Sequence, residues 1–380
     1  MNEQKICIIG DGLAGLTAAT MLSKENVKID LYCSNNKKKI LDKRTTAISE
    51  SNYQYLRKNV NLNTQNFFWA CKNINLFFED KEKIINFYNF EEKNKNLMYI
   101  FQNKDLKKKL DKIISTTNNI KIIKKKIKDI DNEEGFIILG KKKVFYDLII
   151  LCIGRYSNLY DKIEKGRSIE KDYKEIALTA LIKHNTKIVN VSQFFLKEGP
   201  LAILPFQKKI FSTVWSVSNE FYNINKTNIK KILSKKLKML LHIKSIEKIK
   251  SIQSFPINLN LKTKYFKKNV LILGDGLHTV HPMAGQGFNL VLRDINKLKQ
   301  LMSKTLKLGL LIKDSFILKD FYNSRKPENN LFGLGINLTN IFFKDNKYFS
   351  SFKKGILNNI NKFSFIKTIS QSISDKGISF

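Results

Sequence analysis

The stretch of residues 271–294, LILGDGLHTVHPMAGQGFNLVLRD, joins an apolar run, two glycine turns and the start of a helical pattern. Residues 271–273 predict a short buried strand. Glycine pairs follow at 274–276 and 285–287, and apolar residues recur at helical spacing from Phe288 onward. Unpaired N–H groups at a helix N-terminus favour negative charge, and glycine lets a flat ligand approach the backbone. The stretch therefore predicts a loop for a phosphate, or for a ring that becomes anionic on reduction. A plain surface loop does not need a carboxylate, a proline and two glycine turns together.

A second glycine-rich stretch lies near the N-terminus. It reads in the order strand, glycine turn, helix and strand, at residues 6–9, 10–15, 16–22 and 27–32. The turn has the pattern G-x-G-x-x-G, in which Gly10 serves the tight turn, Gly12 the approach of a pyrophosphate and Gly15 the packing of helix on strand. The second strand ends in Cys33-Ser34-Asn35, where an acidic residue usually holds the ribose. We therefore expect a dinucleotide-binding unit in which Ser34 or Asn35 bonds the ribose more weakly.

Composition limits the class of protein. The 380 residues are 43% hydrophobic, and four cysteines are scattered without a C-x-x-C pair. No run of eighteen apolar residues exists, so no transmembrane helix is expected, and the N-terminus lacks the features of a signal peptide. Reduced thiols in a cytosolic setting are the corresponding expectation, and we expect a cytoplasmic protein.

The formal net charge of +35 has three explanations. The first is a genome rich in A and T, because Lys, Asn, Ile and Phe are abundant while only five prolines occur. The others are an acidic membrane surface and nucleic acid. Basic residues are spread along the chain, as at 37–39, 107–109, 124–126 and 141–143, and not gathered in one arm. This spread argues against nucleic acid and leaves the first two explanations open.

The two glycine-rich stretches together resemble the FAD-dependent aromatic hydroxylases, whose fold is that of p-hydroxybenzoate hydroxylase. The motif that carries the resemblance is G-D-G-x-H-x-x-H-P-x-x-G-Q-G-x-N at residues 274–289. The match is closer to the ubiquinone-biosynthesis hydroxylases and covers most of residues 5–330. Further matching segments occur in consistent order at 42–49, 97–106, 199–205, 214–217, 255–256 and 321–325.

The resemblance implies an α/β fold with interleaved domains. A Rossmann-like FAD-binding domain is expected from residues 1–70, 97–165 and 262–326, an antiparallel-sheet substrate domain from 71–96 and 166–261, and a C-terminal helical extension over 327–380. No repeat and no Gly/Ser linker separates the halves. Within the substrate domain, alternation predicts strands at 176–182, 188–195, 201–206 and 210–217, followed by a helix over 229–249. A strand or ribbon is expected at 120–130.

The resemblance also implies the residues of the site. FAD binding falls to Gly10, Gly12, Gly15, Ser34, Arg44, Gln102, Gly154, Asp275, Gly285, Gln286 and Gly287. Of these, Asp275 would bond the ribitol chain and Arg44 the nucleotide or its pyrophosphate. The catalytic set is Pro282, Gly287, Phe288 and Asn289. Backbone N–H groups of the last three would stabilise negative charge on the reduced ring, and the proline would help to exclude water.

The implied reaction is a monooxygenation. NAD(P)H or another donor reduces FAD, dioxygen adds, and a flavin hydroperoxide passes one oxygen to a polyprenyl phenol of ubiquinone biosynthesis. One departure stands in the third family motif, A-D-G-x-x-S, where this chain has Cys152-Ile153-Gly154-Arg155-Tyr156-Ser157. Ile153 thus replaces an aspartate that the family ties to the nicotinamide donor. A second hypothesis is a non-catalytic, FAD-stabilised subunit that presents lipid intermediates in a quinone-synthesis assembly.

Two further features are ambiguous. His278 and His281 form H-x-x-H, but zinc needs more ligands than the four histidines and scattered cysteines supply, so we predict loop-stabilising hydrogen bonds and no metal. Near the C-terminus, apolar residues recur at helical spacing before several lysines: Leu331, Leu334, Leu338, Ile341, Phe342, then Lys344, Lys347, Lys353 and Lys354. This pattern predicts a helix packed on the FAD domain, or an element that faces the inner side of a membrane or another quinone-biosynthesis protein.

Overall fold

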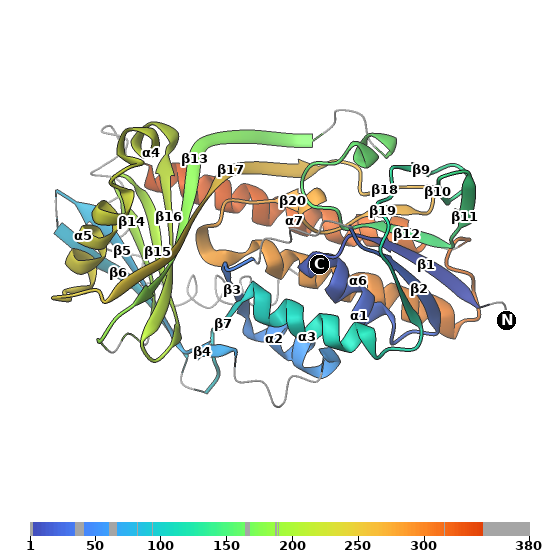
Figure 1. The fold of residues 1–380 in the computed structure, drawn as a ribbon, viewed down its shortest axis with the longest axis horizontal. Coiled ribbons are helices and arrows are strands. Elements are labelled where there is room, and N and C mark those ends of the chain that lie inside the picture. Colours follow the sequence, from blue (N-terminus) through green and yellow to red (C-terminus); the bar gives the residue numbers. More distant parts are fainter. Residues whose placement is uncertain are drawn as a thin grey trace.

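Two large sheets lie side by side along the long axis of the molecule (Figure 1). The computed structural model describes residues 3–34, 42–60, 67–81, 83–92, 94–163, 168–186, 188, 190–314 and 316–344. One sheet has six strands and the other has eight. The predicted α/β class, with a Rossmann-like part beside an antiparallel sheet, is confirmed.

The six-stranded sheet has the order β18-β19-β12-β1-β2-β8. Its strands are β1 (Gln4–Ile9), β2 (Val27–Tyr32), β8 (Ile120–Ile123), β12 (Leu148–Leu151), β18 (Phe266–Lys267) and β19 (Val270–Ile272). All pairs are parallel except β18 with β19. The strands are near-continuous apolar runs because helices cover a parallel sheet. The covering helices include α1 (Leu13–Leu22), which packs on both α3 (Asn103–Ser115) and α6 (Gly287–Lys307). A small sheet of β9 (Asp129–Asp131), β10 (Phe136–Leu139) and β11 (Lys142–Phe145) lies beside it.

The eight-stranded sheet has the order β20-β17-β13-β16-β15-β14-β5-β6. Its strands are β5 (Asn73–Asp80), β6 (Lys83–Glu91), β13 (Ser168–Lys183), β14 (Val191–Leu196), β15 (Gly199–Gln207), β16 (Ile210–Ser218), β17 (Lys248–Lys262) and β20 (His278–Thr279). Neighbours are antiparallel except β14 with β5. Helices α4 (Asn219–Asn225) and α5 (Ile229–Leu241) belong to this half. Each sheet therefore takes strands from three separate parts of the chain.

Two expected elements differ from the structure. The helix over 229–249 is too long, because α5 ends at Leu241, His242 adopts a left-handed conformation with φ of 51°, and β17 begins at Lys248. Pairing of β17 with β13 determines the conformation of that last segment. The ribbon over 120–130 is two short strands, β8 and β9, with irregular chain between them.

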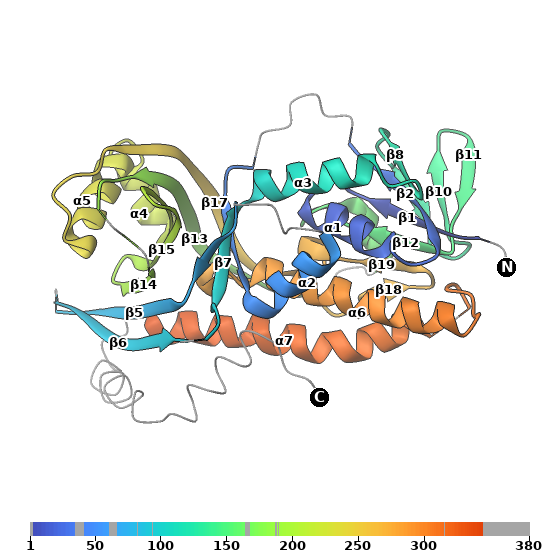
Figure 2. The same cartoon turned by 90° about the horizontal axis from the view of Figure 1, so that it is seen from below.

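A junction and one long helix connect the halves. A three-stranded sheet of β3 (Thr45–Ser49), β7 (Met98–Gln102) and β4 (Trp69–Cys71) lies at the junction, and α2 (Glu50–Val60) follows β3. Helix α7 (Ile317–Phe343) runs along both halves (Figure 2). It contains Pro327, so the expected start of the C-terminal region falls inside a continuous helix. Lys347, Lys353 and Lys354 lie outside the described residues.

No helix in the described part of the chain is long and apolar enough to cross a membrane. The four cysteines are free, and three of them are buried. Burial raises the pKa of Cys71 to about 12, and burial followed by the charge of Asp275 raises the pKa of Cys152 to about 12. These thiols therefore remain protonated and behave as small apolar groups.

Candidate functional site

Three loops leave the carboxyl ends of the neighbouring strands β1, β12 and β19 and touch one another. Gly10 has φ of 119°, and a Cβ atom there would lie 2.1 Å from the carbonyl oxygen of Cys152. A Cβ atom on Gly274 would lie 2.8 Å from that of Ala14. The carboxyl edge of an open parallel sheet is where such folds bind ligands. The loops that the sequence singles out are thus adjacent in space.

The loop that opens α1, residues 10–15, contains two kinds of glycine. Gly15 is required by packing, since a Cβ atom there would lie 2.0 Å from the carbonyl oxygen of Gly10. Gly12 is different, because a Cβ atom on it meets nothing within 4 Å. Gly12 is also the N-cap of α1 and supplies no side-chain cap. Open space beside an uncapped helix N-terminus is a cradle for phosphate.

The loop that precedes α6, residues 274–287, also ends in a glycine with open space beside it, as Gly12 has. A Cβ atom on Gly287 meets nothing within 4 Å. Leu290 makes the first intrahelical bond, from its N–H to Gln286 O at 3.1 Å, so the amides of residues 287–289 precede it. The side chain of Gln286 does not cap the helix, and its Oε1 is buried without a partner among the described residues. These groups can stabilise an anionic part of a ligand.

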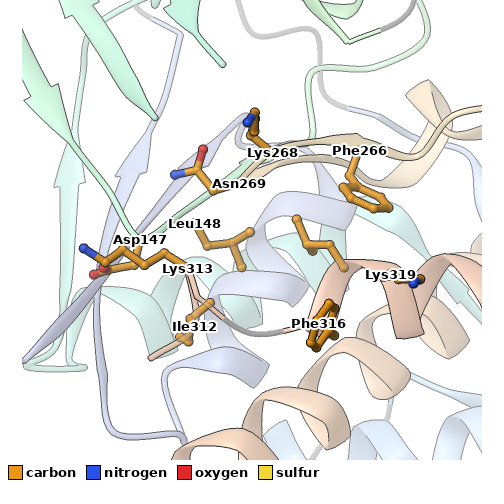
Figure 3. A pocket seen from close by; sticks show the side chains of 10 residues that line it. Asp147, Leu148, Phe266, Lys268, Asn269, Ile312, Lys313, Phe316 and Lys319 are labelled. Atoms are coloured by element: carbon orange, nitrogen blue, oxygen red, sulfur yellow. The ribbon is translucent and has the colours of Figure 1, made fainter. Parts of the chain in front are cut away.

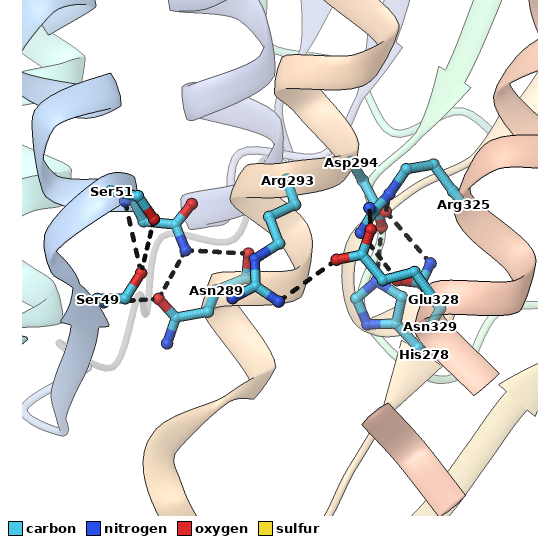
Figure 4. Close-up of polar contacts among 10 residues, drawn as sticks. Ser49, Ser51, His278, Asn289, Arg293, Asp294, Arg325, Glu328 and Asn329 are labelled. Atoms are coloured by element: carbon cyan, nitrogen blue, oxygen red, sulfur yellow. Dashed lines mark hydrogen bonds and ion pairs between the residues drawn. The ribbon is translucent and has the colours of Figure 1, made fainter. Parts of the chain in front are cut away.

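Asn289 fixes the second loop through its side chain (Figure 4). Its Oδ1 accepts from Ser49 N at 2.9 Å and from Asn52 Nδ2 at 2.8 Å. Its Nδ2 donates to Ala47 O at 3.1 Å and to Gly285 O at 3.0 Å. The side chain is therefore fully used in joining α6 to β3 and α2. Only the backbone amide of this predicted catalytic residue is left to meet a ligand.

His278 lies in a buried ionic cluster that joins α6 to α7 (Figure 4). Its Nε2 is 2.6 Å from Asp294 Oδ2, and Arg325 Nε donates to Asp294 Oδ1 at 2.6 Å. Arg325 also bonds Glu328 and Asn329. Burial opposes ionisation of Asp294, but Arg325 and His278 more than offset this effect, so its pKa is lowered. The buried carboxylate is therefore charged and fully paired.

His281 joins the second loop to the large sheet and to the end of α7. Its Nδ1 accepts from Met283 N at 3.2 Å, so Nε2 carries the proton that it donates to Glu175 Oε2 at 3.0 Å. Lys344 lies 2.6 Å from the other carboxylate oxygen. Burial opposes ionisation of Glu175, yet these two partners lower its pKa. Both histidines thus make loop-stabilising hydrogen bonds, and among the described residues no three metal-ligating side chains gather.

Arg44 and Asp275 are close enough to influence one another. Arg44 donates to both oxygens of Asp42, at 2.8 and 2.7 Å, and its guanidinium lies 4.9 Å from the ring centre of Phe255. The hydrogen bond to Asp42 raises the pKa of Arg44, burial opposes this, and the charges of Asp42 and Asp275 raise it further. Asp275 itself is exposed beside the glycine loops. Its exposed carboxylate can meet a ligand, whereas Arg44 has a partner already.

The other expected binding residues surround the same edge. Ser34 is exposed just after β2, beside the first loop, because Gly10 N donates to Tyr32 O at 2.9 Å. Gln102 is buried at the end of β7, directly before α3. Gly154 has φ of 80° and open space at its Cβ position. Pro282 is half-buried and opens the short turn that leads to Gly285, whose φ is 63°.

Sequence patterns missed four supporting side chains. Lys107 donates to Asp11 O in the first loop at 3.0 Å. The hydroxyl of Tyr160 donates to Gly154 O, and a Cβ atom on Gly276 would lie 2.0 Å from it. The others are Glu175 and Arg325. Arg325 ends a matching segment, and its partner Asp294 ends the stretch 271–294, so both positions could have been found from the sequence. Nothing in the sequence pointed to Glu175.

The residues present fit FAD. Space at Gly12 and Gly154 and two uncapped helix N-termini provide places for a pyrophosphate and a flat ring. A family model described as "FAD binding domain" matches residues 160–309. The chain is 24% identical to the ubiquinone biosynthesis monooxygenase COQ6 of Dictyostelium discoideum, over 95% of this chain and 89% of the relative. It is 26% identical to the 3-demethoxyubiquinol 3-hydroxylase of Escherichia coli, over 40% of each. The chain is therefore similar to FAD-dependent hydroxylases of ubiquinone biosynthesis over nearly its whole length.

Solved structures agree with this fold. The p-nitrophenol 4-monooxygenase PnpA of Pseudomonas putida superposes on this chain with a TM-score of 0.80, at 12% identity and 99% of both chains. PqsL of Pseudomonas aeruginosa, a probable FAD-dependent monooxygenase, gives 0.74 at 14% identity over 90% of this chain and 97% of that one. These structures show that the chain has the fold of FAD-dependent monooxygenases.

Proposed function

We propose that the protein is an FAD-dependent hydroxylase that acts on a polyprenyl phenol of ubiquinone biosynthesis, with NAD(P)H as reductant. The observation that carries this proposal is an apolar aromatic cluster that continues directly from the second loop. Met283, next to Pro282, packs with Phe78, Phe87, Tyr88 and Phe195, and with Phe343 from α7. The rings of Phe195 and Phe343 stack at 3.5 Å. Such a cluster suits an apolar substrate better than a charged one.

The names of several relatives support the same pathway. They are the two relatives described above and the ubiquinone hydroxylases UbiM of Neisseria meningitidis and UbiL of Rhodospirillum rubrum, which are 22% and 25% identical. When bound, FAD supplies the redox and oxygen-transfer chemistry. The chain's own contribution would be to bind and orient: Gly12 would leave room for the pyrophosphate, and Asp275 would bond the ribitol chain. Amides of residues 287–289 favour negative charge at the ring.

We also propose where the hydroxylase works. A lipid substrate and a net charge of +35 support a peripheral position on the cytoplasmic face of a membrane, beside other quinone-biosynthesis proteins. The experiment incubates flavin-loaded protein with NADPH, labelled dioxygen and a short-chain prenyl phenol. One labelled oxygen in the product is expected. NADPH consumption that yields only hydrogen peroxide, over a range of prenyl phenols, would contradict the proposal.

The aromatic cluster gives a sharper test. Phe195→Ala and Phe343→Ala should raise KM for a prenylated phenol by about tenfold, because each removes apolar contact area, and should change KM for the unprenylated ring less. Phe145→Ala, an exposed phenylalanine at 58% on β11, is the matched control. Equal effects on both phenols would show that the cluster does not contact the prenyl chain.

A further inference from the structure

The connection between α6 and α7 lies at one end of the molecule (Figure 2) and carries four large apolar side chains that are exposed. The exposed fractions are 66% for Leu308, 53% for Leu310, 38% for Leu311 and 73% for Phe316. These four residues are called the leucine turn below. A group of exposed apolar side chains within nine residues marks a contact surface more often than a single exposed leucine does.

The leucine turn is held in place by buried contacts. Gln4, at the start of β1, donates from Nε2 to Leu310 O at 3.4 Å and accepts from Ile312 N at 2.6 Å. Ile312 is 5% exposed and belongs to the core. Because the backbone on both sides of Leu311 is fixed, the outward direction of these leucines is a property of the fold. A preorganised apolar tip loses little entropy on binding.

Positive charge surrounds the turn. A cavity of about 260 Å³ lies beside it, lined by Phe266, Phe316, Lys268, Lys313 and Lys319 among others (Figure 3). The ammonium of Lys319 lies 5.7 Å from the ring centre of Phe316. Lys307 is exposed one residue before Leu308. The carboxylates of Asp147, Asp314 and Asp320 reduce this charge, but the four lysines at 268, 307, 313 and 319 leave it positive.

We propose that the leucine turn and its lysines dock the hydroxylase on an anionic lipid bilayer. Apolar tips with basic flanks bind where acyl chains meet acidic headgroups. Four apolar side chains are few beside the roughly 20–30 residues per side of a standard protein interface. The turn lies at the amino end of β1, opposite the glycine loops, so docking leaves the FAD site free. The choice of a membrane rests on the proposed function, whereas the place of contact rests on the geometry.

A second exposed apolar face lies on α7 and serves as a matched control. Leu331, Leu334, Leu338 and Ile341 are 40–64% exposed along one stripe. Residues 330–343 contain no lysine or arginine. The lysines that the structure places beside this stripe are engaged, Lys171 with Asn337 and Lys344 with Glu175. The stripe therefore offers less free positive charge to an acidic surface than the leucine turn does.

The test measures binding of the full-length, flavin-loaded protein to protein-free vesicles of phosphatidylcholine, with and without phosphatidylglycerol. Wild type should bind the anionic vesicles, and less so as salt rises. The triple variant Leu308→Ser/Leu311→Ser/Phe316→Ser should lower the partition coefficient by at least about tenfold. Leu331→Ser/Leu334→Ser/Leu338→Ser should leave it unchanged. Flavin content and melting temperature show that each variant is folded.

The role of charge is tested with two variants that lose the same net charge at different places. Lys307→Gln/Lys313→Gln/Lys319→Gln should weaken binding to anionic vesicles, whereas Lys124→Gln/Lys125→Gln/Lys126→Gln removes the same charge from an exposed site elsewhere and should have little effect. Equal losses in the two triples, loss only in the α7 variant, or no vesicle binding by wild type would each overturn the proposal. Binding to native membranes but not to lipid vesicles would point to a protein partner and also overturn it.

The two proposals fail separately. Hydroxylation of a short, water-soluble prenyl phenol needs no membrane, so docking variants should retain it. A protein that hydroxylates but does not bind vesicles keeps the proposed function and loses the docking surface. A protein that binds vesicles through the turn but hydroxylates no prenyl phenol keeps the docking surface and loses the proposed function.

Discussion

The two glycine loops of the site do similar work but are held in different ways. The loop before α1 is fixed by its own backbone: Gly10 and Gly15 pack so tightly that a methyl group on either would meet a carbonyl oxygen at about 2 Å. The loop before α6 is fixed by side chains from elsewhere, with His278 on Asp294, His281 on Glu175, and Asn289 on β3. Local sterics hold the first loop, and long-range polar contacts hold the second. The two loops should therefore respond to different perturbations.

The largest effect is expected from Gly15→Ala. The added methyl group would lie 2.0 Å from Gly10 O, which is backbone and cannot move aside. We expect a loss of at least about 3 kcal/mol in the free energy of unfolding, measured by chemical denaturation of the flavin-free protein. Gly12→Ala, where a methyl group meets nothing within 4 Å, is the control and should unfold like wild type. Equal stability of the two variants would refute the steric account of this loop.

Gly12→Val should separate cofactor binding from folding. A Cβ atom at this position meets nothing within 4 Å, and the branched side chain would extend into the space that the pyrophosphate would take. We expect FAD affinity to fall by at least about 100-fold, with the melting temperature of the flavin-free protein preserved. Gly335→Val, in open space on α7, adds the same group away from the site and should keep its flavin. A yellow, folded Gly12→Val protein would show that this loop does not hold the pyrophosphate.

Acid should loosen the second loop before the first. The folded-state pKa of Glu175 is lowered, so its ionised form stabilises the fold above the ordinary value of 4.5, and this stabilisation is lost as pH falls through the lower folded pKa. The free energy of unfolding of wild type should exceed that of Glu175→Gln by about 1–3 kcal/mol at neutral pH. This difference in stability should disappear below about pH 4.5. Thermal unfolding of both proteins between neutral pH and pH 3 measures this difference.

An exposed carboxylate provides the control for this pH effect. Glu247→Gln, in an ion pair with Lys183 on the surface, should show a smaller difference at every pH. A gap for Glu175→Gln that stays constant down to pH 3 would mean that the carboxylate is not what secures the loop.

The smallest effect concerns Ile153, which follows the Cys152 carbonyl that Gly10 packs against. Ile153→Asp restores the family's aspartate beside the first loop. One charge-assisted hydrogen bond contributes roughly 1.5–3 kcal/mol at most, so we expect about a tenfold faster anaerobic reduction of the flavin by NADPH. Ile153→Asn is the uncharged control and should gain less. Fast reduction of wild type by NADPH would show that this departure from the motif has no such consequence.

The same contrast explains what the sequence could predict. Strand β2 and the strands of the glycine units were predictable because apolar runs and G-x-G-x-x-G are local patterns. So was the α/β fold, through the motif at residues 274–289. Glu175 was not, because its partner His281 is 106 residues away and only the folded sheet brings them together. The contact of Arg44 with the nucleotide stays a prediction, and its pairing with the neighbouring Asp42 is one that a two-residue spacing permits but does not require.

The order in which strands are synthesised differs from the order in which they pair. Strand β1 pairs with β12, more than a hundred residues later, and β12 pairs with β19, which ends at Ile272. Strand β5 likewise pairs with β14, which is synthesised more than a hundred residues later. During synthesis the apolar strand β12 therefore has an unpaired edge until more than a hundred further residues have left the ribosome. Unpaired strand edges promote aggregation. The interleaving that lets distant segments share one site therefore makes the nascent chain a natural client for chaperones.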